Sequence, residues 1–554
     1  MTEQVPHTHD QSPALQEQLD AAQTRIRDLE RQVDETSATA EELQRALACL
    51  KEEYLVLKRL LYGPRRERLT EDPNQQHLFD TDAGLSVPLL EPVVENQAQS
   101  PHHRKGHGRR PIPDHVPRRD VLHDVPDEER TCGCGREKVK IGEDTTEQLD
   151  YIPGKLEVLR HIYPKYACSC CKDGVTAAPR VASPIAGGLA GPGLLSYVMC
   201  SKFAVHIPLY RQQDELARAG VLLARSTLCD WIAQCGVVLK PLVDLMRTRV
   251  LLSHVINADE TPVPVLDPTR DSTRKSYLWT YLGDSDHPFT VFDYRDSRNR
   301  DGPSEILKSY RGYLQTDAYT CYDSVVSKSN GRIVAVGCWA HARRGFFDAR
   351  TNQPREAHYA LSLIGQLYDI EEEFQKSTAD ERLAARQERS VPVLDRLKTF
   401  FDEQAPAALP KSQYGKAIGY ACNQWESLRR YAEDGRLVID NNTSERTLRV
   451  AAIGRKNWLF FGSDRGGETA AICLSILASA KRHLIEPFAY VRALLVALAA
   501  DESDLEALLP DTWIKAHPEY VVEYRRDEAE AAANRRSKRR RNRRLKSNQS
   551  GEAK

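Results

Sequence analysis

Three acidic residues stand where the sequence predicts rigid backbone. Asp259 and Asp317 each end a short run of β-branched and aromatic residues, and Glu445 lies at the start of a helical stretch. Mg²⁺ prefers hard oxygen ligands, and two such ions can align and neutralise the oxygens that react when a phosphodiester is cleaved. Two strand carboxylates and one helix carboxylate therefore indicate metal-dependent phosphodiester cleavage.

The same carboxylates also have structural interpretations. The two strand residues could mark a turn at a strand end and the cap of the following helix. Glu445 lies three residues after Asn442, which is the spacing of a helix capping box. Asp440 and Glu468 are the nearest alternatives for a third metal ligand.

Basic residues follow these carboxylates closely in the sequence. They are Arg343 and Arg344, then Arg446 and Arg449 beside Glu445, and then Arg455 and Lys456. Guanidinium groups bind phosphate oxygens in a bidentate manner, so contacts with a DNA backbone are expected, with internal ion pairs as the alternative. His341 could orient a phosphate, or it could be an ordinary structural histidine.

Five of the 13 cysteines are concentrated in one segment. They are Cys132 and Cys134 before a strand-like stretch at 147–166, and Cys168, Cys170 and Cys171 after it. Two pairs of thiolates, with Cys132, Cys134, Cys168 and Cys171 as the chosen set, can close a tetrahedral Zn²⁺ site. A degenerate site without metal and unrelated core cysteines are the alternatives.

The charge of the chain is unevenly distributed. Lys and Arg number 78 against 79 Asp and Glu, for a formal net charge of −1. Nine basic residues and no acidic one lie between Arg535 and Lys546, so the rest of the chain is acidic. A second basic strip, with Arg109 and Arg110, lies in a polar stretch. Such flexible arginines can follow a phosphate backbone or enter a narrow minor groove, and a solvated charge run is the alternative.

The apolar pattern predicts the elements that must position the carboxylates. Strands are predicted at 254–259, 277–282, 289–294, 313–317 and 332–337, with a helix at 304–310 and another from Trp339. This order is typical of an α/β ribonuclease H-like fold. In such a fold Asp259 would lie on the first strand and Asp317 at the end of the fourth. A helical insertion separates these elements from the helix that begins near Asn442.

Two helices before the first strand form a helix-turn-helix pattern. The first is predicted at 209–220 and ends on a glycine, and the second restarts at Arg225 with Ser226 or Thr227 as its N-cap. The pattern favours DNA binding with Arg225 as a contact residue, and an ordinary helical hairpin is the alternative.

The N-terminal segment has a heptad pattern. From Leu15 to Leu61 mostly apolar residues alternate at spacings of four and three, and neither Pro nor Gly interrupts residues 15–62. This pattern predicts a coiled coil that assembles the chain into a homo-oligomer. An amphipathic helix packed on the body is the alternative.

Composition and patterning also exclude protein classes and define domains. No stretch reaches the roughly 18 apolar residues of a membrane helix, and Met1–Asp10 lacks the order of a secretory signal, so we expect a cytoplasmic protein. The expected domains are a leucine-zipper coiled coil (1–64), a basic disordered linker (65–119), a zinc-binding segment (120–185), a helix-turn-helix-like DNA-binding region (186–248), a ribonuclease H-like catalytic domain (249–350 and 438–500), a helical insertion (351–437) and a C-terminal element with the basic tail (501–554).

Eight short motifs follow one another along the chain. They are LYGPRRERL (61–69), GHGRRP (106–111), PKYAC (164–168), PLYRQ (208–212), ADETP (258–262), WAHARR (339–344), DNN and ER within 440–446, and GRKNWLF (454–460). In this order and spacing the chain resembles the DDE transposases of the insertion-sequence-sixty-six family, of the TnpC type. The first cysteine pair departs from the family, because this chain has Cys132-Gly133-Cys134 where Cys-x-x-Cys is usual.

The resemblance implies an enzyme that binds the inverted-repeat ends of its insertion sequence. It would nick DNA with metal-activated water and join the freed 3′-hydroxyl to target DNA, with Mg²⁺ or Mn²⁺ at Asp259, Asp317 and Glu445 and with structural Zn²⁺. Its implied partners are end and target DNA, further copies of the chain and accessory proteins of the same element, at the bacterial nucleoid.

Two other functions remain open on the sequence. One is a zipper-dimerised DNA-binding regulator whose nuclease-like domain is inactive, although all three carboxylates are present. The other is a metal-dependent nuclease that cleaves without joining strands.

The uneven charge yields a prediction for the basic tail. Each phosphate neutralised adds about 0.9 to the magnitude of the log-log salt slope of DNA binding, so truncation before Arg535 should flatten the slope by several units. Affinity for specific and random DNA should fall by similar factors, because phosphate contacts carry no sequence information. Gel-shift titrations at several salt concentrations measure both quantities, and a loss confined to specific DNA would contradict this role.

Overall fold

The computed structural model describes residues 181–317, 320–502 and 504–528, and in addition 17–18, 20–27, 47, 50, 54, 154, 156–162, 165–167, 175–177 and 531. The chain divides into two compact units, one comprising residues 1–78 and 162–554 and the other residues 79–161. Nearly all of the second unit lies outside the described residues.

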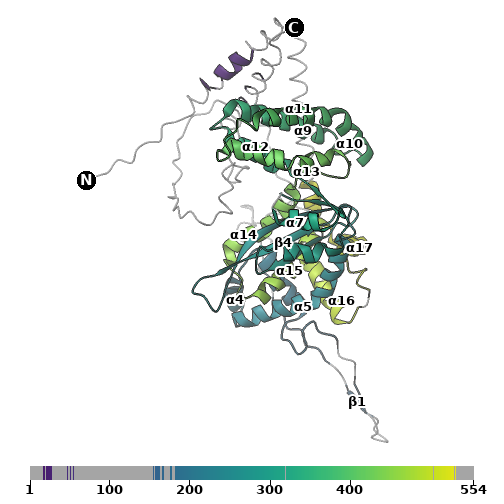
Figure 1. Ribbon diagram of the computed structural model, residues 1–554. Coiled ribbons are helices and arrows are strands. Elements are labelled where there is room, and N and C mark those ends of the chain that lie inside the picture. The colour runs from purple at the N-terminus through teal and green to yellow at the C-terminus, as the bar shows by residue number, and fades with distance from the viewer. Residues whose placement is uncertain are drawn as a thin grey trace, which may run out of the picture. The chain divides into compact units, whose positions relative to one another are not determined.

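A five-stranded mixed sheet organises the first unit (Figure 1). Its strands are β3 (Val255–Val265), β4 (Arg274–Leu282), β5 (Thr290–Arg295), β6 (Gly312–Gln315) and β7 (Ile333–Val336). They are hydrogen-bonded in the order β5-β4-β3-β6-β7, with antiparallel pairing from β5 to β3 and parallel pairing from β3 to β7. All five predicted strands are present, although β3 and β4 are longer than predicted.

Strand β3 continues six residues beyond its predicted end at Asp259. Its parallel partner β6 pairs only with residues 255–257, so beyond that point one edge of β3 is free of a neighbouring strand. Pro262 and Pro264 lie in this extension, where a missing backbone N–H costs no ladder hydrogen bond. The two prolines made the extension look like a turn in the sequence.

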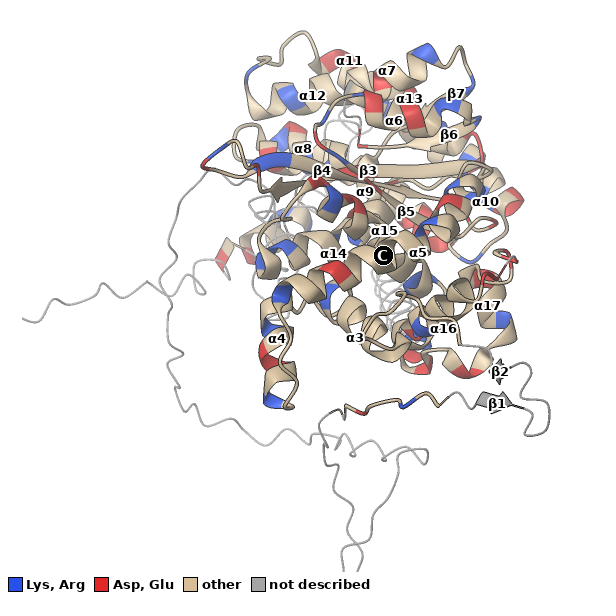
Figure 2. Ribbon diagram, turned by 90° about the horizontal axis from the view of Figure 1, so that it is seen from below, with Lys and Arg blue, Asp and Glu red and all other residues tan. Residues whose placement is uncertain are grey.

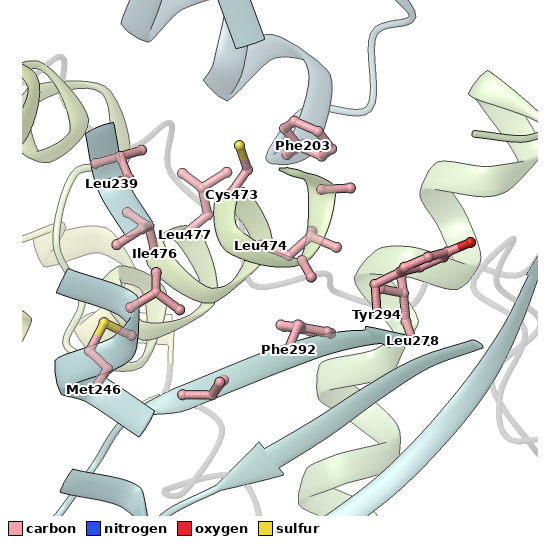
Figure 3. Close-up of a cluster of buried hydrophobic side chains, with 14 of the residues drawn as sticks. Phe203, Leu239, Met246, Leu278, Phe292, Tyr294, Cys473, Leu474, Ile476 and Leu477 are labelled. Carbon is pink, nitrogen blue, oxygen red and sulfur yellow. The ribbon is translucent and has the colours of Figure 1, made fainter. Parts of the chain in front are cut away.

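Helices on one side of the sheet build the main core. Helix α5 (Arg225–Val250) and helix α15 (Asp464–Arg482) pack on each other and on β5, and α3 (Pro192–Phe203) packs on α16 (Pro487–Ala499). Figure 3 shows Leu239 and Met246 of α5 facing Ile476 and Leu477 of α15, with Phe292 of β5 beneath them. Apolar burial of this kind is the main favourable term in folding.

Two buried serines of α15 close the edge strand β5. The Ser475 hydroxyl accepts a hydrogen bond from the Phe292 N–H at 2.8 Å, and the Ser479 hydroxyl accepts from the Thr290 N–H at 3.0 Å. Ser479 also donates to the Thr290 carbonyl at 3.0 Å. An exposed edge would be free to pair with another chain, so these hydroxyls protect the sheet.

The predicted pair of helices before the sheet is present as α4 (Leu209–Arg218) and α5. Gly220 has φ of +86° and ends the first helix, as its position predicted. The predicted N-cap of the second helix was wrong, because α5 begins at Arg225 with Ala224 as N-cap and no side-chain capping bond. Helix α5 is 26 residues long and contributes to the core along its length, so it is more than a short recognition helix.

The predicted helical insertion has a hydrophobic core of its own. It contains α9 (Pro354–Glu373), α10 (Ala379–Ala385), one π-helical turn (Arg386–Ser390), α11 (Val391–Gln404), α12 (Gln413–Asn423), α13 (Trp425–Arg429) and a 3₁₀ turn (Arg430–Ala432). These helices form a group separate from α5, α15 and α16 (Figure 1). Helix α8 (Trp339–Ala349) joins this group, with Phe346 stacked on Phe401 at 5.4 Å between ring centroids.

Arg386 ties the insertion to the segment that leads back toward the sheet. It is 1% exposed and makes a bidentate ion pair with Glu371 at 2.7 and 2.8 Å. Its remaining donors reach the backbone carbonyls of Tyr431, Asp434 and Leu437. All of its hydrogen-bonding groups are thus used inside the protein.

The structure contains several further described elements. They are β1 (Lys165–Ala167), β2 (Val175–Ala177), α6 (Asp301–Ile306) with a 3₁₀ turn (Leu307–Ser309), α7 (Thr320–Lys328), α14 (Asn442–Trp458), α17 (Pro510–Ala516) and a 3₁₀ turn (Pro518–Tyr520). The helix predicted at 304–310 corresponds to α6 and its 3₁₀ turn. Within the described part of the chain, no helix has both the length and the apolarity needed to cross a bilayer.

The N-terminal heptad segment is described at only a few positions. Residues 20–27 are helical, and the Gln23 side chain donates to the Tyr54 hydroxyl at 2.8 Å. The rest of the predicted coiled coil lies outside the described residues.

The buried Arg386 yields a stability prediction. Arg386→Met should destabilise the protein by about 3–5 kcal/mol, because it leaves the Glu371 carboxylate without its buried partner. Arg389→Met is the matched control, since Arg389 is 42% exposed in its ion pair with Glu373 and should cost about 1 kcal/mol or less. Urea denaturation followed by tryptophan fluorescence compares the two variants. Equal losses in the free energy of unfolding would show that Arg386 does not have this special role.

Candidate functional site

The parallel pairing of β3 and β6 brings two of the predicted carboxylates to neighbouring positions. The last laterally paired residues are Asn257 and Gln315. Asp259 and Asp317 each follow two residues later, at the point where the two strands part, with Asp259 still on β3 and Asp317 just beyond the end of β6. The carboxyl ends of parallel strands are a frequent place for ligand sites.

Helix α14 supplies the third carboxylate in its first turn. The helix begins at Asn442 with Asn441 as N-cap, and neither cap nor box hydrogen bonds are made by side chains there. The capping interpretation of Glu445 was therefore wrong, since Glu445 is the fourth residue of the helix. α14 packs on β3 and β4, which turns its first turn toward Asp259.

A buried network of side chains sets the position of α14. The Asn441 amide donates to the Ala258 carbonyl at 2.9 Å and accepts from Asn257 at 3.1 Å and from Ser444 at 2.9 Å. Asn257 also donates to Gln315 at 3.2 Å. Because Asn441 is fully buried, each of these bonds replaces one to water, and the network holds strand and helix in one arrangement.

The electrostatics of Asp259 show that the three carboxylates share one environment. Burial, followed by the negative charges of Asp317, Glu260 and Glu445, raises the pKa of Asp259 well above its usual value. The Glu260 N–H donates to Asp259 at 2.8 Å and opposes this shift in pKa. Folding thus brings like charges together at a cost, which is common at functional sites.

Glu260 is a fourth carboxylate that the sequence interpretation did not select. Its side chain is 2% exposed and pairs with the Arg298 guanidinium, and the Tyr322 hydroxyl donates to it at 3.4 Å. Burial and the charge of Asp317 raise its pKa, against the opposing effect of Arg298. Its place directly after Asp259 was visible in the sequence, but its partners come from segments far away in the chain.

His341 lies beside Glu445. Its Nδ1 atom is 3.8 Å from a Glu445 carboxylate oxygen, which is beyond hydrogen-bond distance. Nδ1 is buried and has no hydrogen-bond partner among the described residues. The imidazole is therefore part of the same site, in the first turn of α8.

The two alternative third carboxylates are engaged elsewhere or exposed. Asp440 accepts hydrogen bonds from the Asn442 side chain at 2.7 Å and from the Tyr368 hydroxyl at 3.1 Å. Glu468 is exposed on α15. Neither is among the main causes of the raised pKa of Asp259.

The donor set of the site suits a hard cation. Asp259, Asp317 and Glu445 offer carboxylate oxygens, which Mg²⁺ and Mn²⁺ prefer, and their mutual repulsion favours a bound positive charge. In the described part of the chain, no three His, Cys, Asp or Glu side chains lie close enough together to form a finished metal site. The carboxylates share a charged environment without closing on a single point.

The predicted basic residues fall into two groups. Arg225, Arg344, Arg446, Arg449 and Lys456 are exposed, and Arg343 is half-buried. Arg455 is also half-buried, and its guanidinium donates to the Pro262 carbonyl, so it serves the packing of α14 on β3. Figure 2 shows Lys and Arg recurring along α14 and α4.

The predicted zinc ligands and the linker arginines lie outside the described residues. This applies to Cys132, Cys134, Cys168, Cys171, Arg109 and Arg110. Strands β1 and β2 pair as an antiparallel hairpin on either side of residues 168–174. The strand-like stretch predicted at 147–166 was wrong over residues 156–162, which form no strand.

Comparison with known proteins identifies relatives of the chain. Residues 187–469 match the family described as "Transposase IS66 family", residues 129–172 match "zinc-finger binding domain of transposase IS66", and residues 49–121 match "Transposase C of IS166 homeodomain". The uncharacterized protein y4jD of Sinorhizobium fredii (strain NBRC 101917 / NGR234) is 36% identical over 494 residues, covering 85% of this chain and 96% of the relative. From the same strain, the uncharacterized protein y4qI is 33% identical over 477 residues (82% and 87%), and the uncharacterized protein y4hP is 32% identical over 499 residues (84% and 89%).

The raised pKa of Asp259 predicts how one substitution affects stability without metal. The pKa of Asp259 is higher in the folded than in the unfolded state. Protonated Asp259 therefore supports the folded state at low pH, and this contribution to stability is lost as the pH rises through the folded pKa. Asp259→Asn should therefore stabilise the metal-free protein at neutral pH, by about 1.4 kcal/mol for each unit between the unfolded and folded pKa. The gain should vanish below about pH 4, where the carboxyl is protonated in both states.

Urea denaturation in EDTA at several pH values tests this expectation. Asp244→Asn is a control on exposed α5 surface and should change the free energy of unfolding by about 0.5 kcal/mol or less. A loss of stability on Asp259→Asn at neutral pH would show that Asp259 is not held among like charges.

Proposed function

This chain belongs to the IS66 family of transposases, and we propose that it cuts DNA at the inverted-repeat ends of its insertion sequence and joins the freed ends to target DNA. Asp259, Asp317 and Glu445 are the proposed catalytic carboxylates. The supporting observation is their common environment, in which the charges of Asp317 and Glu445 both raise the pKa of Asp259.

The strand order supports a ribonuclease H-like catalytic domain. Such a domain has three antiparallel strands followed by two parallel ones, and this is the pairing from β5 to β7. Its proposed parts are residues 249–350 and 438–500, with the helical insertion at 351–437 between them. In this arrangement Asp259 lies on the first strand, Asp317 follows the fourth, and Glu445 lies on the helix after the insertion.

Asp259, Asp317 and Glu445 would hold two divalent cations, Mg²⁺ or Mn²⁺. When bound, such ions would activate the attacking oxygen and neutralise charge on the leaving oxygen. The residues of the chain hold the carboxylates in place, through the buried Asn441 amide, and keep Glu260 paired with Arg298. A zinc ion held by Cys132, Cys134, Cys168 and Cys171 is a separate structural proposal.

The reaction has two steps of the same type. A water oxygen first attacks the phosphorus at the end of the element, and the 3′-oxygen leaves with a proton as a 3′-hydroxyl. That hydroxyl then attacks a phosphodiester of the target, forming a new P–O bond while the target's own 3′-oxygen leaves. The bond count is conserved in the second step, so strand joining needs no external energy source.

DNA contacts are proposed for the exposed and half-buried basic residues near the carboxylates. Arg446, Arg449 and Lys456 lie on α14, and Arg343 and Arg344 lie on α8 beside His341. Contacts of this type fix the position of a backbone and carry no sequence information. Sequence reading is proposed for the helix-turn-helix-like region with Arg225, the linker with Arg109 and Arg110, and the zinc segment.

Assembly of the two ends would use the N-terminal segment. Further copies of the chain are the proposed partners, because the heptad pattern at 15–62 is typical of a coiled coil and the family match at 49–121 covers its end. Accessory proteins of the same element are a second class of proposed partner.

The sharpest test uses conservative substitutions of the three carboxylates. Asp259→Asn, Asp317→Asn and Glu445→Gln should each reduce end cleavage and joining by roughly 100-fold or more, since even residues behind metal ligands are worth 10–100-fold. DNA affinity should stay the same, because these side chains hold metal and not DNA bases. The assay incubates full-length protein with labelled inverted-repeat DNA, target plasmid and Mg²⁺.

The control and the outcomes separate the competing functions. Glu468→Gln, on the exposed surface of α15, should leave both steps intact. Cleavage without joined product would favour a simple nuclease, whereas tight binding without cleavage would favour a DNA-binding regulator. Full activity of Glu445→Gln would remove Glu445 from the catalytic set.

A further inference from the structure

A strained turn projects two apolar side chains at the end of α14. Leu459 has φ of +65° and ψ of −57°, and the Phe460 N–H donates to the Trp458 carbonyl at 2.8 Å. This is a γ-turn of the rare, strained kind, in a conformation that non-glycine residues avoid. Leu459 is 61% exposed and Phe460 is 39% exposed.

The residues on both sides of the turn hold it in place. Trp458 and Phe461 stack on each other with ring centroids 4.6 Å apart. Phe461 is buried and is fixed to β3, because its N–H donates to the Pro264 carbonyl at 2.9 Å and its carbonyl accepts from the Leu266 N–H at 2.8 Å. The stack therefore makes the two residues between Trp458 and Phe461 project from the surface. We term these two residues the Leu459–Phe460 tip.

Backbone strain of this kind is unfavourable and persists only where the surrounding structure enforces it. A glycine at this position would adopt positive φ without that cost. A leucine here adds strain and exposes apolar surface, and both are unfavourable for the isolated chain. Residues of this type cluster at ligand-binding sites.

Exposed basic residues lie near the tip in the sequence. Arg449 and Lys456 are exposed and lie at helical spacings from Glu445, so one face of α14 runs from the proposed catalytic residue to the tip. Arg465 is exposed just beyond it. Fourteen residues of helix correspond to about 21 Å, or about six base pairs of DNA.

We propose that the Leu459–Phe460 tip is an apolar wedge that enters the DNA base stack within about six base pairs of the cut. Side chains such as Phe and Leu are inserted between base steps by proteins that bend DNA, which unstacks the step and kinks the duplex. The neighbouring cations suit the phosphate backbone on either side. Two side chains are also far too small for a protein interface, which buries about 800 Å² on each partner.

This inference rests on the proposed function, since it assumes that DNA lies along α14. The wedge is thus a device for distorting DNA, separate from the carboxylates that react with it.

The test measures base unstacking directly. Inverted-repeat DNA carries 2-aminopurine at successive positions around the cut, and full-length protein is added with Ca²⁺ in place of Mg²⁺. Fluorescence should rise at one step, and the rise should be lost in the double variant Leu459→Ser with Phe460→Ser. Leu409→Ser is the matched control, because Leu409 is 75% exposed on the insertion and should keep the signal.

Cleavage with Mg²⁺ gives a second reading. Unstacking a step costs a few kcal/mol, so the double variant should cleave intact ends about tenfold more slowly or worse. An end that carries a mismatch at the identified step is already unstacked and should restore most of the rate. Rescue by a mismatch would not occur if the substitutions merely damaged the fold.

The outcomes distinguish the wedge from the function on which it rests. Normal cleavage without any fluorescence change would overturn the wedge and leave the proposed function intact. A double variant that changes the oligomeric state but not the DNA signal would assign the tip to a protein contact. If the unsubstituted protein failed to bind or cleave inverted-repeat DNA at all, both the wedge and the proposed function would be overturned.

Discussion

The side chain of Asn441 holds together the elements that carry the candidate site. It is fully buried and contacts Asn257 and the Ala258 carbonyl of β3 and Ser444 of α14, while its N–H donates to the Cys338 sulfur at 3.2 Å just before α8. Each candidate lies within four residues of a network member, since Asp259 follows Ala258, His341 follows Cys338 and Glu445 follows Asn441. Three amide side chains, one hydroxyl and one thiol are enough to fix the site, because the buried members lose their partners without gaining water if the arrangement changes.

This rigid frame explains why the site can tolerate repulsion between its carboxylates. Asp259 is held beside Asp317, Glu260 and Glu445, and burial together with these like charges raises its pKa. A flexible site would relieve this repulsion by moving the side chains apart. The ion pair of Glu260 with Arg298 offsets part of the negative charge, and a cation from outside the chain would offset more of it.

The helical insertion takes part in the same frame although it has its own core. It leaves after α8 and returns to the sheet over residues 427–441. On the return, the Gly337 N–H donates to the Ser427 carbonyl at 2.8 Å, the Gln315 side chain donates to the Val438 carbonyl at 2.7 Å, and the Trp339 N–H donates to the Ile439 carbonyl at 3.1 Å. Arg386 also fixes this returning segment. The insertion therefore places Asn441 and α14 at a defined position relative to the sheet. The insertion therefore lies between Asp317 and Glu445 in the sequence without separating these two residues in space.

Local patterns were sufficient to predict the five strands, the helical insertion and the helix that begins at Asn442, whereas the catalytic role of the three carboxylates and the DNA contacts of the basic residues around them stay predictions. Apolar periodicity and glycine positions act over a few neighbouring residues, so they can be read along the chain. Long-range packing was needed for the continuation of β3 through Pro262 and Pro264, because the free edge that permits two prolines exists only when β6 has ended. It was also needed to exclude the capping interpretation of Glu445, to add Glu260 with Arg298, and to commit Arg455 to the backbone of β3. These features depend on partners 38 to 193 positions apart, which no local pattern records, and on the burial that makes each partner obligatory.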